Sequence, residues 1–77
     1  MTVKIRFFAS MRDRMGRAED KVDIQGTTTV AELWKRLANG AAMPTSTLIA
    51  VNMEYTDSNH PIKDGDEVAF FPPVTGG

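Results

Sequence analysis

The residues of this sequence that could do chemistry lie at its carboxyl end. The chain closes with Gly76 and Gly77, which carry no side chains. The terminal carboxylate can therefore enter a narrow channel and be approached without steric hindrance. A carboxylate acylates other groups only after one of its oxygens has become a good leaving group. Because the chain has no cysteine, thiol chemistry is excluded, and we expect any acyl or sulfur chemistry to use Gly77.

The residues before the glycines predict a stiff arm. Pro72 and Pro73 fix φ near the polyproline value and cannot donate hydrogen bonds to a sheet, so the chain should leave the preceding strand there. An apolar strand over 67–71 leads into the prolines without a polar linker, which argues against a frayed end or a tag remnant. We expect a folded domain over residues 1–71 and an extended tail over 72–77.

Size and composition limit the classes of function. The chain has 77 residues, 42% of them hydrophobic and 25% charged, which suits one small domain. The net charge is −1 and the basic residues form no long run, so we expect no nucleic-acid partner. No apolar run approaches ~20 residues and no signal peptide is recognisable, so we expect a cytoplasmic protein without membrane contact. A single histidine, His60, predicts no metal site.

Alternation of apolar residues predicts two strands at the start of the chain, over 3–9 and 19–24. Between them, Ser10 and Asp13 have the spacing of a helix N-cap and its partner, and Gly16 ends a short helix over 10–16. We interpret the basic residues around this helix as a solvated face and not as a partner-binding patch. They are Arg12, Arg14 and Arg17.

The main helix is predicted over residues 30–38. Thr29 and Glu32 form a capping box at its start, and Asn39-Gly40 stops it. Its apolar stripe must pack across a sheet, because so short a helix is not stable alone. The stripe consists of Val30, Leu33, Trp34 and Leu37.

The last part of the chain predicts a buried strand over 48–51, a short segment at 55–56, loops over 57–66 and a final strand over 67–71. Parity places Val68 and Phe70 in the core and Phe71 on the opposite face. With Phe8 and Tyr55 nearby, this face would carry an aromatic docking patch beside the tail. The element order predicts an α+β fold with one mixed sheet, one main helix across it, and the first and last strands adjacent at its centre. This is the β-grasp, or ubiquitin-like, architecture.

The chain resembles the ubiquitin-like sulfur carriers, in particular the MoaD family of molybdopterin synthase small subunits. The resemblance rests on the element order and on short motifs, and the carboxyl-terminal block is the most specific of them. The motifs are Phe7-Phe8-Ala9 with Arg12, then Ala50-Val51-Asn52, His60-Pro61, and the run from Asp64 to Gly77.

The resemblance implies that Gly77 is adenylated by an enzyme similar to ubiquitin-activating enzymes, which uses ATP, and is then thiocarboxylated by a sulfur donor. The tail would enter the large subunit of a heterotetrameric synthase and give sulfur to a cyclic pyranopterin precursor, forming the dithiolene of molybdopterin. The chain itself would bind no cofactor and supply no general acid or base. Docking would use Phe8, Tyr55 and Phe71 together with the tail residues Pro72, Pro73, Val74, Thr75 and Gly76.

Three alternatives remain at this point. The chain could be the related carrier of the thiazole pathway, although the spacer over 70–75 argues against this. It could be a ubiquitin-like modifier that forms isopeptide bonds with lysines of target proteins. It could also be a non-covalent binding module whose tail has no role.

Overall fold

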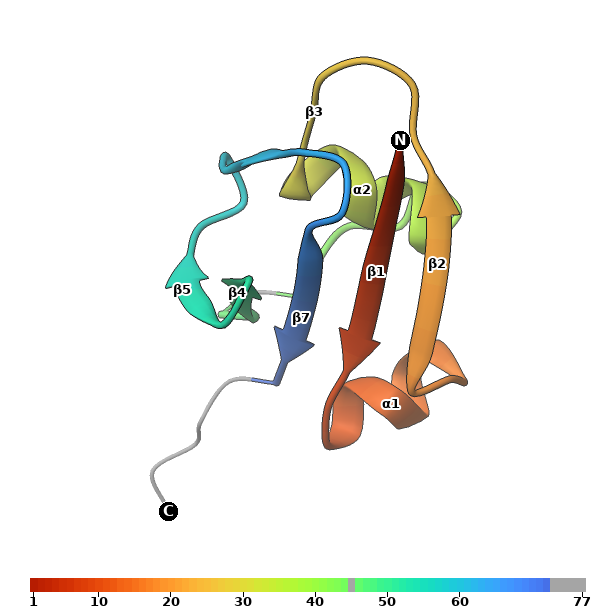
Figure 1. Cartoon of the computed structure of the whole chain (residues 1–77). Helices are drawn as coiled ribbons and strands as arrows, with labels where there is room; N and C mark the ends of the chain where they lie inside the picture. Colours follow the sequence, from red (N-terminus) through yellow and green to blue (C-terminus); the bar gives the residue numbers. More distant parts are fainter. Residues whose placement is uncertain (45, 73–77) are drawn as a thin grey trace.

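The computed structural model describes residues 1–44 and 46–72, and in this part the chain forms one mixed sheet with a helix across one face (Figure 1). The five strands of this sheet lie in the order β2-β1-β7-β4-β5, and a small second sheet pairs β3 with β6. The elements are β1 (Thr2–Phe7), α1 (Ser10–Met15), β2 (Glu19–Asp23), β3 (Thr28–Thr29), α2 (Val30–Leu37), β4 (Leu48–Val51), β5 (Glu54–Thr56), β6 (Pro61–Ile62) and β7 (Glu67–Phe71).

The first and last strands are neighbours at the centre of the sheet. β1 and β7 run parallel, β2 and β4 flank them in antiparallel pairing, and α1 connects β1 to β2. The α+β architecture with adjacent terminal strands is therefore confirmed. β7 ends at Phe71, and most of the expected tail, residues 73–77, lies outside the described residues.

The hydrophobic core lies between the sheet and α2 and is built around Phe70. The Phe70 ring stacks on Phe7 with centroids 5.8 Å apart, and the Trp34 ring meets it edge-on at 5.0 Å. Both arrangements are favourable for aromatic quadrupoles. Phe70 is fully buried, and the four apolar residues of the α2 stripe are buried as predicted.

The start of α2 confirms the predicted capping box. The Thr29 hydroxyl oxygen accepts a hydrogen bond from the Glu32 backbone N–H at 3.3 Å, and the two side chains meet at 3.2 Å. The first contact satisfies one of the backbone donors that a helix start leaves free, and in the second the Thr29 hydroxyl donates to the Glu32 carboxylate. Asn39 and Gly40 follow the helix with positive φ angles of 53° and 88°, so the predicted stop is also confirmed.

The predicted cap of α1 is wrong. Ser10 lies inside the helix, and the N-cap position is Ala9, whose side chain makes no capping bond. Ala9 has φ of 52°, because the chain must turn sharply between the end of β1 and a helix that buries Met11. Burial of Met11 thus compensates for the missing cap in this short helix.

The solvated basic face predicted for this region is correct for two of its three arginines. Arg12 and Arg14 are exposed. Arg17 instead packs its guanidinium 5.4 Å from the centroid of the Phe7 ring, and its Nε lies 2.9 Å from Asp20 Oδ2. Arg17 therefore covers the edge of the core and is a structural residue.

The second small sheet was missed by the sequence interpretation, which placed residues 61 and 62 in a loop and predicted no strand before the main helix. Thr28 pairs with Ile62 and Thr29 with Pro61, and the buried Ile62 adds to the core. Each strand has two residues, too short for an alternation pattern to be visible.

Asp66 fastens the β4–β5 hairpin to the turn before β7. Its Oδ1 accepts a hydrogen bond from the Asn52 side-chain amide at 2.9 Å, and its Oδ2 accepts one from the Lys63 backbone N–H at 2.8 Å. Partial burial disfavours its charge, but these two bonds and the charges of Lys63 and His60 outweigh burial and lower the pKa of Asp66 below its ordinary value. The carboxylate therefore stabilises the turn that carries the hairpin tip.

Phe70→Ala and Phe71→Ala form a matched pair that tests strand parity. Phe70→Ala leaves a cavity in the core and should lower the free energy of unfolding by about 3–5 kcal/mol. Phe71→Ala removes a half-buried ring on the other face and should cost about 1–2 kcal/mol. Urea denaturation measures both, and equal losses would contradict the assignment of the two rings to opposite faces.

Asp66→Asn should lower the free energy of unfolding by about 1–2 kcal/mol at neutral pH. The NH2 group of the new side chain would face either the Asn52 amide or the Lys63 N–H, so one of the two hydrogen bonds is lost. The folded-state pKa of Asp66 is depressed, so its contribution is present above the unfolded-state pKa and disappears as pH falls through the folded-state value. The difference between wild type and variant should therefore shrink in acid. Urea denaturation across acidic pH measures this, with Asp13→Asn at an exposed position of α1 as the control that should show no comparable loss.

Candidate docking face and tail root

The sheet face opposite α2, which we call the open face, is organised in cross-strand rows. Backbone pairing aligns Ala50, Ala69 and Arg6 on three neighbouring strands, so their side chains project from the same face. The same pairing extends this row to Tyr55 on β5 and to Glu19 on β2. One continuous row of side chains thus crosses all five strands.

An aromatic patch occupies the end of the open face where β7 finishes. Phe8 and Phe71 stack almost parallel, with ring centroids 4.7 Å apart and an interplanar angle of 6°, and both are half-buried. Tyr55 lies 6.1 Å from the Phe71 ring and is 74% exposed. The sequence predicted that these three residues gather, and the structure brings them together.

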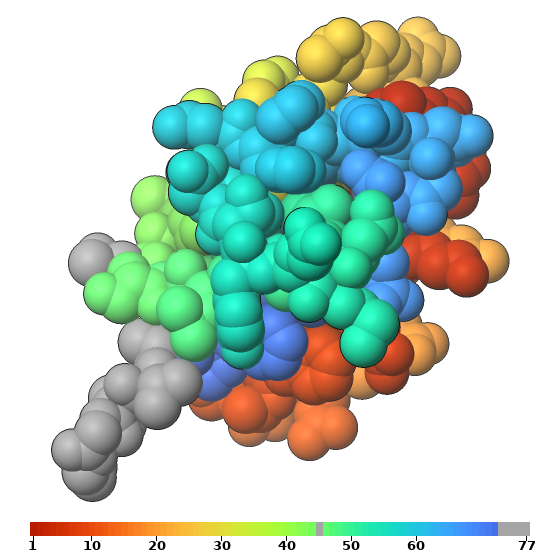
Figure 2. All heavy atoms as spheres, turned by 60° about the vertical axis from the view of Figure 1, so that its left-hand side comes forward, coloured from red at the N-terminus to blue at the C-terminus, as the bar shows by residue number. Residues whose placement is uncertain are grey.

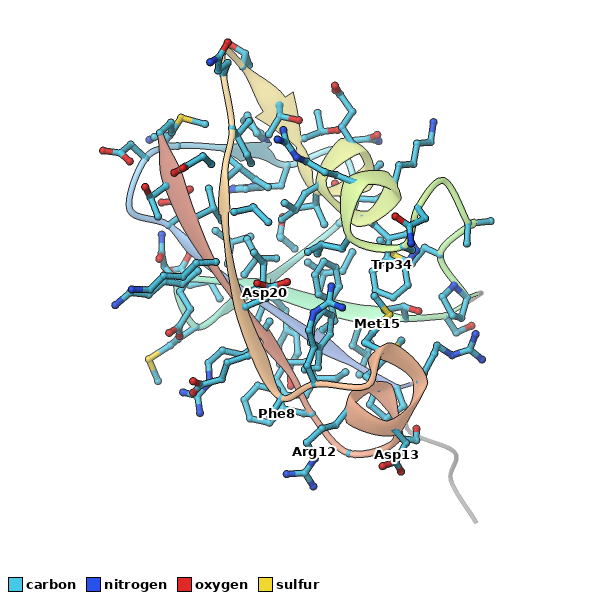
Figure 3. All side chains as sticks on the ribbon, turned by 90° about the vertical axis from the view of Figure 1, so that its right-hand side faces the viewer. Phe8, Arg12, Asp13, Met15, Asp20 and Trp34 are labelled. Carbon is cyan, nitrogen blue, oxygen red and sulfur yellow. The ribbon has the colours of Figure 1, made fainter. Side chains whose placement is uncertain are left out.

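Figures 2 and 3 show how the strand ends near this patch lie relative to the helices. Figure 2 shows the teal β4–β5 hairpin at the front, with the blue end of β7 below it. In Figure 3, Trp34 and Met15 lie on the side of α2 and α1, whereas Phe8 lies at the end of β1. The aromatic patch therefore lies outside the helix-covered layer, where another protein can reach it.

The tail root, the point where the chain leaves the sheet, lies next to this patch. The Phe8 backbone N–H donates to the Phe70 carbonyl at 3.1 Å, which extends the β1–β7 ladder almost to the end of β7. Pro72 follows directly and is half-buried. The predicted site residues Pro73, Val74, Thr75, Gly76 and Gly77 lie outside the described residues. What the structure provides is a rigid central strand from which they start.

The other end of the open face is charged. Lys4 pairs with Lys21 on β2 and with Glu67 on β7 in the row beyond Arg6. The face therefore changes from aromatic at the tail root to charged at the far end. Such a face offers apolar contacts beside the tail root and polar contacts at its far end.

No three of the histidine, aspartate and glutamate residues in the part of the chain that the structure describes gather closely enough to hold a metal ion. Among its helices, none is both long enough and apolar enough to span a membrane. The arrangement is suited to docking and to presenting the segment after Pro72.

Two residues of this surface were missed by sequence reasoning. Met53 is 91% exposed at the hairpin tip, and Arg6 lies over the Phe8 ring at 5.4 Å from its centroid. The alternation of β1 already placed Arg6 on the outer face with Phe8, so that signal was available. The position of Met53 depends on the turn geometry and had no comparable signal.

Known proteins match the chain over nearly its whole length. The ThiS family profile matches residues 5–77. The molybdopterin synthase sulfur carrier subunit of Escherichia coli K12 is 39% identical, and the match covers 97% of this chain and 99% of that protein.

Solved structures agree with this match. SAMP1 from Haloferax volcanii, at 24% identity, superposes with a TM-score of 0.84 over all of both chains, which supports the fold. A chain of the complex of subunits 1 and 2 of molybdopterin-converting factor from Helicobacter pylori 26695 is 28% identical, with a TM-score of 0.69 and full coverage of both chains. From the family profile and this full-length identity, the chain belongs to the ThiS family, among the molybdopterin synthase sulfur carrier subunits of the MoaD type.

Proposed function

We propose that this chain carries sulfur on its carboxyl terminus and delivers it within a molybdopterin synthase. The carboxylate of Gly77 attacks the α-phosphate of ATP in an adenylating partner similar to ubiquitin-activating enzymes, and pyrophosphate leaves. Sulfide supplied by a sulfur donor then attacks the acyl carbon and AMP leaves, so that a thiocarboxylate remains. The activation is needed because carboxylate oxygen is a poor leaving group and adenylate is a good one.

The thiocarboxylate then serves as the sulfur donor for a cyclic pyranopterin precursor held by the large subunit. Its sulfur is anionic near neutral pH and polarisable, so it is a good nucleophile. Hydrolysis of the acyl intermediate returns the carboxylate of Gly77, and the chain can be charged again. ATP and the catalytic groups belong to the partner proteins in this scheme.

The observation that carries the proposal is the position of the tail root beside the aromatic patch. β7 is paired on both sides, and its last residue, Phe71, stacks on Phe8. A partner that covers the patch therefore also receives the residues after Pro72. The complex known for the Helicobacter pylori relative supports a large subunit as that partner. Binding of the patch thereby fixes where the carboxylate is delivered.

Deletion of Gly77 should abolish charging. We expect the full-length chain, incubated with ATP, sulfide and the adenylating enzyme, to form an adenylate and then a species heavier by the oxygen-to-sulfur difference. Intact-protein mass spectrometry measures both species. The deleted chain should form neither, because its terminal carboxylate lies one residue short of the reacting position.

Mass spectrometry and denaturing gels together separate the sulfur carrier from the protein modifier. A single free species with the sulfur mass increase supports the carrier, whereas a ladder of heavier conjugates on denaturing gels of cell extract supports a protein modifier. Molybdenum cofactor formation in cells that contain only the chain lacking Gly77 would overturn the proposal.

Phe71→Asp should weaken binding to the large subunit by about tenfold or more, because it places a charge in the centre of an apolar contact. Lys21→Asp, at the charged end of the same face, is the control and should bind almost as wild type does. Isothermal titration calorimetry measures the affinities, and thermal melts follow folding. Loss of the cooperative melt in Phe71→Asp would show that Phe71 supports the core.

A further inference from the structure

The centre of the open face is hollowed, because its middle row has two small residues. Ala50 and Ala69 are directly paired and form the floor of a cavity of about 320 Å³. Phe8 and Phe71 form the wall toward the tail root. A volume of this size accepts one or two large side chains from a partner.

The remaining walls of this cavity differ in chemistry. Met53 and Tyr55 of the β4–β5 hairpin stand on one side, and Arg6 with Glu67 stands on the other. Both hairpin residues are largely exposed, Met53 at 91% and Tyr55 at 74%. The cavity therefore has an apolar side and a charged side, where the guanidinium of Arg6 and the carboxylate of Glu67 both stand.

Arg6 is held in place but is not fully paired. Its guanidinium lies 5.4 Å from the Phe8 ring centroid, and one of its nitrogens lies 3.9 Å from Glu19 Oε1. That ion pair is long and exposed, with 45% of the Arg6 side chain and 72% of the Glu19 side chain accessible. Burying so long an ion pair is unfavourable, so a protein that covers the cavity binds best if it offers Arg6 a closer acceptor.

Met53 occupies a strained position at the cavity rim. The two residues of the hairpin loop, Asn52 and Met53, have φ of 52° and 70°, as in a type I′ turn. Asparagine tolerates this left-handed conformation, but the second position favours glycine, and methionine is disfavoured there. The strain points to a role for the methionine side chain outside the folding of the domain.

We propose that this cavity receives a projecting apolar side chain of the synthase large subunit, with a carboxylate of the same subunit beside it that pairs with Arg6. Met53 adapts its flexible side chain to the inserted group, and Arg6 fixes the orientation of the contact. This inference rests on the proposed function, since it concerns the same partner. The cavity lies next to the tail root, so the contact would set the position of the tail.

Arg6→Glu tests the charge, with Lys4→Glu as the matched control. Both residues lie on β1 and project from the same face, and both substitutions change the net charge equally, but Lys4 does not border the cavity. Calorimetric titration with the purified large subunit should show Arg6→Glu weaker by about tenfold or more and Lys4→Glu within about threefold of wild type. Equal losses would overturn the assignment of Arg6.

Arg6→Leu is the second variant, in case Arg6→Glu, which faces Glu19, melts below the assay temperature. It keeps an apolar stem and should make the affinity for the large subunit less dependent on salt between about 50 and 300 mM. An unchanged salt dependence would contradict the paired carboxylate.

Met53→Gly separates docking from stability. Relief of the left-handed strain should raise the melting temperature by about 4–8 °C. The affinity for the large subunit should fall about fivefold, because the inserted group loses its contact with the methionine side chain. Unchanged affinity would overturn the role of Met53. If wild type itself does not bind the large subunit, the proposed function fails. If wild type binds and the variants bind equally well, only the assignment of the cavity fails.

Discussion

Two adjacent phenylalanines at the end of each of two parallel central strands divide this small domain into a core side and the open face. Because β1 and β7 pair in register, Phe7 meets Phe70 beneath the helix, and Phe8 meets Phe71 on the open face. Side chains alternate along a strand, so neither pair can move to the other face unless the other pair moves as well. The core and the aromatic patch are therefore determined by one register.

This coupling explains how a chain of 77 residues can combine stability with an exposed aromatic surface. A small domain buries a limited fraction of its surface and has few apolar groups to spare. Here the rings on the open face cover each other, and Arg6 lies over Phe8, so part of their area is removed from water without a second layer. The rest stays accessible to a partner.

Hydrogen bonds at both ends of β7 stabilise the fold and also fix the positions of the hairpin tip and the tail root. Asp66 connects the turn before this strand to Asn52 in the hairpin, and the ladder with β1 extends to the Phe8 N–H beyond it. Both ends of β7 are thus fastened to neighbouring strands. The hairpin tip and the tail root keep fixed positions on one surface, which limits the entropy lost on docking.

Much of this protein is determined by its sequence alone. Alternation in the terminal strands, the Thr29–Glu32 capping box and the α2 stripe are local patterns, and they led to the α+β architecture and to the faces of Phe8 and Phe71. The family likeness also rests on sequence, chiefly on its final block. These features depend on residues near one another in the chain, whose spacing follows from helix and strand geometry.

Tertiary structure decided the features that arise from residues distant in sequence. The β3–β6 pair, the packing of Arg17 on Phe7, and the cavity over Ala50 and Ala69 all bring together segments with no shared local pattern. The cap of α1 was mispredicted for the same reason, since burial of Met11 and not the spacing of Ser10 and Asp13 sets where that helix begins. Local propensities of short elements are weak, and packing against the rest of the chain outweighs them.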